Sequence, residues 1–121
     1  MSVPVELPAL RSRLAEFGDR AFLMSVTDEE TPHVVSVVVR LDGDRLVTSV
    51  GRRTRANAEA RPTITLLWPA PSGAPYCLIV DGTFAGETPA GDIAVEPTSA
   101  VLHRVAGTPG DGPNCIPVTE S

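Results

Sequence analysis

The residues from Thr48 to Asn57 carry the clearest chemistry in the chain. They read Thr-Ser-Val-Gly-Arg-Arg-Thr-Arg-Ala-Asn, so a stretch of strand character ends at a glycine and three arginines follow within four residues. Glycine permits a sharp turn, and the helix-like segment 56–60 then directs its free N–H groups and positive dipole end to the same point. Such a convergence suits a phosphate group. The same residues could equally form a solvated basic turn.

The composition indicates one small globular domain. A chain of 121 residues forms a single modest core, and 42% hydrophobic residues separate it from disordered proteins. Aromatic residues make up only 4%, which suits a small β-barrel whose core a partner subunit or a flat cofactor completes. A net charge of −5 argues against binding to nucleic acid or to a membrane surface. Every basic residue is arginine, which excludes catalysis by a lysine.

The cysteines give no sign of a metal or redox site. Cys77 and Cys115 lie far apart and match neither a zinc-binding spacing nor a CxxC motif. We expect no disulfide between them, and therefore a reducing, cytoplasmic location. The N-terminus lacks the regions of a signal peptide, and no apolar run approaches transmembrane length.

The pattern of apolar residues predicts a mainly β protein. Leucines at helical spacing predict an N-terminal helix over 8–17, and a second, short helix is expected over 56–60. The β-rich segments between turn residues predict an antiparallel barrel of about six strands. The expected strands cover 20–27, 33–40, 45–50, 63–68, 76–85 and 93–106, the last of them kinked or divided at Pro97.

Two details of this pattern bear on the organisation of the chain. The segment 33–40 is apolar on both faces, so we expect this strand to be covered on both sides. From residue 107 onward Pro, Gly and polar residues dominate. We therefore expect a domain over 1–106 and a flexible C-terminal tail over 107–121.

The ordered series of motifs carries a resemblance to a known family. It consists of Thr-Pro-His-Val-Val-Ser-Val, then Leu-Asp-Gly-Asp-Arg-Leu-Val-Thr-Ser, Gly-Arg-Arg-Thr-Arg-Ala-Asn and Ala-Arg-Pro, then the strand 63–68 and the segment 76–80 before Asp-Gly-Thr-Phe-Ala. This series resembles the pyridoxamine 5′-phosphate oxidase-like family of flavin-binding split β-barrels over residues 20–106. The resemblance implies a homodimer that binds FMN, or the deazaflavin coenzyme F-420, in two grooves at the dimer interface.

The resemblance also implies where the cofactor binds. The strand beginning at His33 would offer backbone groups to the edge of the isoalloxazine ring, and Arg53 matches a basic phosphate ligand of the family. A lysine of the family pattern is replaced by Thr54, and Arg55 would take over its charge. The Tyr76–Cys77 region would reach the flavin from the other subunit. The implied cofactor-binding residues are His33, Val34, Val35, Ser36, Val37, Thr48, Ser49, Arg53, Thr54, Arg55, Asn57, Tyr76 and Cys77.

A flavin enzyme needs little catalytic machinery of its own, because the cofactor performs the redox step and the protein positions it. The chain offers no convincing triad or carboxylate pair, and it lacks the C-terminal Arg-x-His element of true pyridoxamine phosphate oxidases. We therefore predict an FMN- or F-420-dependent oxidoreductase that acts on a small molecule other than a B6 vitamer. A non-catalytic flavin carrier is an alternative. A haem-binding split barrel is a weaker one, since only His33 and His103 could supply an axial nitrogen.

Overall fold

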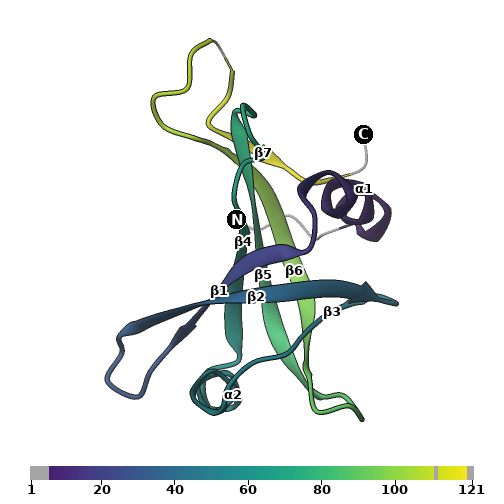
Figure 1. Cartoon of the computed structure of the whole chain (residues 1–121), viewed down its shortest axis with the longest axis vertical. Helices are drawn as coiled ribbons and strands as arrows, with labels where there is room; N and C mark the ends of the chain where they lie inside the picture. Colours follow the sequence, from purple (N-terminus) through teal and green to yellow (C-terminus); the bar gives the residue numbers. More distant parts are fainter. Residues whose placement is uncertain (1–5, 111, 120–121) are drawn as a thin grey trace.

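Two helices and seven strands make up the part of the chain that this computed structural model describes, residues 6–110 and 112–119 (Figure 1). The elements are α1 (Leu7–Phe17), β1 (Arg20–Val26), β2 (Pro32–Asp42), β3 (Arg45–Thr48), α2 (Arg52–Ala60), β4 (Thr63–Trp68), β5 (Tyr76–Glu87), β6 (Ile93–Arg104) and β7 (Cys115–Pro117). All strand pairings are antiparallel. The predicted mainly β fold with one N-terminal and one internal helix is confirmed.

Six of the strands close into a barrel, and the seventh extends it. Their order is β3-β2-β1-β4-β5-β6, and β3 pairs again with β6 to close the circle. β6 is long enough to change neighbours along its length: residues 93–95 pair with β3 and residues 101–103 pair with β7. The barrel therefore closes at one end of β6, while β7 covers the edge of the other end.

Alternating apolar residues on the strands fill the barrel. Leu23, Leu66 and Leu78 are fully buried, as is Trp68, whose indole Nε1–H donates to the carbonyl oxygen of Gly18 at 3.1 Å. Leu10 of α1 is also fully buried. Figure 1 shows α1 and α2 on opposite sides of the crossing strands β1 and β2. Neither described helix is long and apolar enough to span a membrane.

The expectation that the strand over 33–40 is covered on both sides is not met within one chain. Val37 and Val39 are buried, but Val34 and Val38 on the other face are 54% and 57% exposed. A single barrel has only one inside, so a strand with two apolar faces leaves one of them on the outer surface. That face is available to another molecule.

Two segments differ from the sequence prediction by more than two residues at an element's end. Helix α2 begins at Arg52 rather than at residue 56, because the arginines are good helix formers and continue the helix back to the glycine. The segment 107–121, expected to be a flexible tail, contains β7, which pairs with β6. Val118 follows β7 and is 4% exposed, so burial of this side chain helps to hold the strand in place.

The glycine within β5 marks a close approach between strands. The register between β5 and β6 shifts between Asp81 and Gly82, which marks a β-bulge. A Cβ atom at Gly82 would lie 2.6 Å from Cγ1 of Val95 and 2.8 Å from the carbonyl oxygen of Glu96. The bulge also lets β6 run through Pro97 as one strand.

Candidate functional site

Helix α2 begins with positive charge that no acidic residue of its first turn balances. Its N-cap is Gly51, which has no side chain to cap the helix, and the first turn contains Arg52 and Arg53. The first N–H groups of a helix have no partner inside it and form the positive end of its dipole. The two guanidinium groups lie close to this end and are unfavourable there. An anion bound at this point would be attracted to the two guanidinium groups and to the N–H groups of the helix end.

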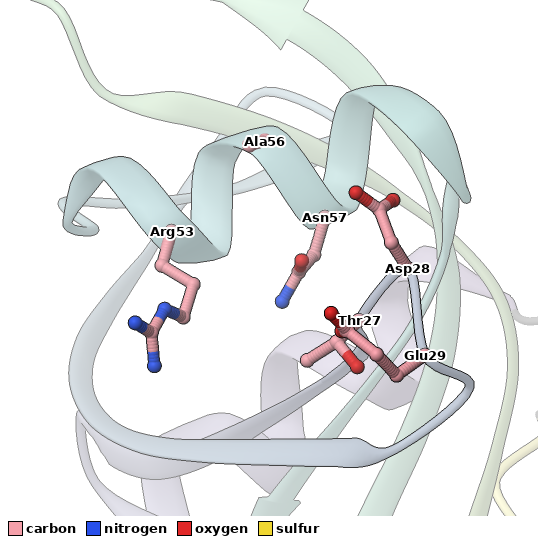
Figure 2. A pocket seen from close by; sticks show the side chains of 6 residues that line it. All are labelled: Thr27, Asp28, Glu29, Arg53, Ala56 and Asn57. Carbon is pink, nitrogen blue, oxygen red and sulfur yellow. The ribbon is translucent and has the colours of Figure 1, made fainter.

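A pocket of about 390 Å³ lies beside this part of the helix. Figure 2 shows it between α2 and the turn that joins β1 to β2. The lining residues are Arg53, Ala56 and Asn57 from the helix and Thr27, Asp28 and Glu29 from the turn. Arg53 is exposed and, within the described residues, forms no hydrogen bond or ion pair. Its guanidinium group is therefore free to bind a ligand.

Buried polar contacts fix the helix against the barrel. Asn57 is 6% exposed, and its side-chain nitrogen donates to the hydroxyl oxygen of Ser25 on β1 at 3.1 Å. Thr54, one turn earlier on the same face, is 2% exposed. These two residues orient α2 so that Arg53 projects into the pocket (Figure 2). Thr54, expected from the resemblance to stand in place of a lysine, thus packs against the barrel.

The other two arginines near the helix are held by contacts within the chain. Arg55 forms an ion pair with Glu87 and donates to the carbonyl oxygen of Gly91 at 2.6 Å. Arg61 forms an ion pair with Asp28 at 2.9 Å. Arg55 therefore ties the helix to the end of β5 and to the turn between β5 and β6.

One edge of β2 has backbone groups without a strand partner. Residues 32–38 pair with β1 on one side, whereas β3 pairs only with residues 39–42 on the other. Within the described chain no further backbone hydrogen bond reaches residues 33–37 on that free side. N–H and C=O groups of this segment can therefore bind an external planar molecule with polar edges. The segment comprises the implied site residues His33, Val34, Val35, Ser36 and Val37.

The two hydroxyl residues at the end of β3 differ in their surroundings. Thr48 is 1% exposed, and its hydroxyl donates to the carbonyl oxygen of Val38 at 2.8 Å. That hydroxyl bonds β3 to β2 at the point where their pairing ends. Ser49 is exposed and lies two residues before Gly51, the N-cap of α2. Of the two hydroxyls, that of Ser49 is the more accessible to a ligand.

Tyr76 and Cys77 lie far from α2 within the same chain. They begin β5 at the end of the barrel opposite α2 (Figure 1). The Tyr76 hydroxyl donates to the carbonyl oxygen of Pro113 at 2.7 Å, and the guanidinium group of Arg104 lies 5.9 Å from the ring centroid. One chain alone does not bring these two residues to the pocket. A site that contains them requires a second copy.

Of the residues predicted for the site, the structure thus places Arg53 and Asn57 on the lining of one pocket. Sequence analysis missed the pocket's opposite wall, formed by Thr27, Asp28 and Glu29. These residues read as an ordinary polar turn. The only signal was their place immediately before the strand that was expected to lie along the flavin.

Comparisons with known proteins give the family. No family model matches the sequence. Two relatives, the uncharacterized proteins Mb0449c of Mycobacterium bovis and MT0457 of Mycobacterium tuberculosis, are each 38% identical over 117 residues, covering 84% of this chain and 82% of the relative. The chain belongs to the same family as these two proteins. Their names assign them no function.

The solved structures similar to this family member are pyridoxamine 5′-phosphate oxidase-like split barrels. An F-420 reductase has a TM-score of 0.56 at 21% identity and is covered over 88% of its length, with 68% of this chain. A putative pyridoxamine 5′-phosphate oxidase from Listeria innocua has a TM-score of 0.62 at 18% identity, covering 98% of that chain and 80% of this one. An FAD-binding protein from Mesorhizobium loti has a TM-score of 0.57 at 11% identity, covering 90% of that chain and 81% of this one. The predicted split-barrel fold is confirmed.

Proposed function

We propose that this protein is a homodimeric oxidoreductase that binds FMN or coenzyme F-420 and acts on a small molecule. The observation that carries the proposal is the free guanidinium group of Arg53, at the start of a helix without a cap and on the wall of a pocket. It is supported by the fold, which is shared with an F-420 reductase and a putative pyridoxamine 5′-phosphate oxidase.

Each part of the proposed site has a task. Arg53 and the first N–H groups of α2 bind the phosphate group, because both present positive charge to one point. The free edge of β2, residues 33–37, binds the polar edge of the ring through backbone groups. Asn57 holds the helix in register with the barrel through Ser25. When bound, either cofactor supplies hydride transfer; the protein positions it and limits access of water.

The second subunit is expected to cover the apolar outer face of the barrel. Phe22 is 40% exposed and Val34 is 54% exposed. Phe22 lies in register with Leu67, and Leu67 with Ile79, so apolar side chains form a continuous row across three strands. Exposed apolar surface of this kind marks contact sites. A twofold arrangement across this face would also bring Tyr76 of one subunit toward the pocket of the other.

Two measurements test the proposed function. The visible spectrum of the purified protein, and titration of the cofactor-free protein with FMN and with coenzyme F-420, should show binding of at least one of them. A colourless protein that binds neither would refute both the enzyme and the carrier alternatives. A spectrum with the Soret band of haem would instead support the haem-binding alternative.

The dimer has its own test. Val34→Glu places a charge on the exposed outer face without touching the core, so the barrel should fold while the dimer dissociates. Light scattering after size exclusion should give the mass of two chains for the wild type and of one chain for the variant. The control is Thr83→Glu, at an exposed position near the end of β5, which should leave the dimer intact. Ser99→Glu is unsuitable as a control because Ser99 contacts Asp81. A wild type that is monomeric at all concentrations would refute the dimer.

A further inference from the structure

The charges around the pocket discriminate between the two candidate cofactors. Four arginines lie on or next to α2, and together they would make a broad basic groove. Two of them are neutralised within the chain: Arg55 by Glu87, and Arg61 by Asp28. Of these four, only Arg52 and Arg53 have no carboxylate partner among the described residues. The positive charge available to a ligand is therefore confined to the first turn of the helix.

The opposite wall of the pocket is acidic. Asp28 and Glu29 both line it (Figure 2). Arg61 balances Asp28, whereas Glu29 has no ion-pair partner among the described residues. An anion that extends from the first turn of α2 across the pocket therefore meets a free carboxylate.

The turn that carries these carboxylates is held in a fixed shape. The backbone N–H of Thr27 donates to the carbonyl of Thr31 at 3.0 Å, and the N–H of Glu30 donates back to the carbonyl of Thr27 at 2.9 Å. Glu30 has φ of 62°, in the left-handed region that favours glycine. The turn keeps this strained backbone, and it presents Glu29 to the pocket. Reorientation of the turn away from a bound anion would break these hydrogen bonds.

We propose that the acidic turn at Asp28 and Glu29 makes this site selective for a flavin that ends in a single phosphate over a deazaflavin with an acidic tail. The inference rests on the proposed function, because it assumes that the phosphate binds at Arg53. A terminal phosphate is compact and carries up to two charges, which suits a small cationic point. In coenzyme F-420 the phosphate is esterified to the tail and carries one charge, and the tail brings further carboxylates near Glu29.

Isothermal titration of the full-length protein with FMN and with F-420 tests this selectivity. The wild type should bind FMN more tightly, and Glu29→Gln should narrow the ratio of the two Kd values by about fivefold at low salt, as expected for one nearby like charge. The ratio should narrow less in high salt, because screening weakens the repulsion. Glu59→Gln is the matched control, since Glu59 is an exposed carboxylate of α2 outside the pocket.

The outcomes separate the two proposals. F-420 binding as tightly as FMN, or an equal ratio of Kd values in Glu29→Gln and wild type, would overturn the selectivity while the proposed function stands. Failure of the protein to bind either cofactor would overturn the proposed function and the selectivity together. Riboflavin, which lacks the phosphate, provides the reference: it should bind more weakly than FMN, and Glu29→Gln should leave its Kd unchanged.

Discussion

Replacing Arg53 by alanine should weaken cofactor binding and at the same time stabilise the empty protein. The guanidinium group has no partner in the described chain, so its removal costs the folded state no hydrogen bond. It also removes positive charge from the positive end of α2, which is worth about 0.3–1 kcal/mol at low ionic strength. We expect the Tm of the cofactor-free variant to rise by about 1–5 °C.

The effect on binding is larger and of opposite sign. A hydrogen bond between charged groups contributes about 1.5–3 kcal/mol, so the Kd for FMN should increase roughly tenfold to a hundredfold. Titration calorimetry measures the affinity, and thermal unfolding of the same samples measures the stability. Arg45→Ala is the control, because Arg45 is exposed on β3, has no partner among the described residues and lies outside the pocket. It should change neither quantity by a comparable amount.

Either of two results would refute this reasoning. A variant that binds FMN as tightly as the wild type would mean that the phosphate lies elsewhere. A variant whose cofactor-free form unfolds at a lower temperature would mean that Arg53 makes a stabilising contact, contrary to its free guanidinium group. A higher Tm of the cofactor-free variant together with a higher Kd for FMN is expected only if Arg53 destabilises the empty protein and binds the ligand.

Other substitutions test how the site is supported. Asn57→Ala should lower the free energy of unfolding by about 1–3 kcal/mol, because it leaves the buried hydroxyl of Ser25 without its donor. Urea unfolding measures this free energy. The double variant with Ser25→Ala should lose less stability than the sum of the losses in the two single variants. Gly82→Ala should destabilise by about 1–3 kcal/mol, since its Cβ would overlap Val95. Thr83→Ala, exposed next to it on β5, should stay within about 0.5 kcal/mol; equal losses in these two variants would contradict the close approach.

Local sequence signals predicted the barrel well. The alternation of the strands and the turns between them depend on neighbouring residues, and the six predicted strands appear within two residues of their expected bounds. The signals failed where the outcome depends on distant residues. β7 forms because Cys115–Pro117 pairs with the edge of β6 and because the side chain of Val118 is buried. The proline and glycine content of this segment does not predict a strand that pairs with β6.

The site was predicted in part for the same reason. The cluster of arginines next to a glycine indicated the helix terminus, but sequence could not divide the arginines by role. Arg55 pairs with Glu87, 32 residues away in the sequence, and Arg61 pairs with Asp28, 33 residues away in the sequence. Only the folded barrel shows that these charges are already balanced and that Arg53 is not. The acidic wall of the pocket was missed because a polar turn is common in any β protein.

Three departures from local preference lie in α2 and in the turn and strand that follow β1. Arginine at the start of a helix opposes the dipole, Glu30 adopts a backbone conformation that favours glycine, and the edge of β2 at residues 33–37 has no strand beside it. Elsewhere the strands alternate regularly and the described buried side-chain polar atoms all have hydrogen-bond partners. Sequences depart from local preference mainly where function requires it. A ligand with a phosphate at one end and a flat polar edge at the other would relieve the charge at the helix start and pair the open strand edge. Under the proposed function, two of the departures, the arginine at the helix start and the open strand edge, therefore share one explanation.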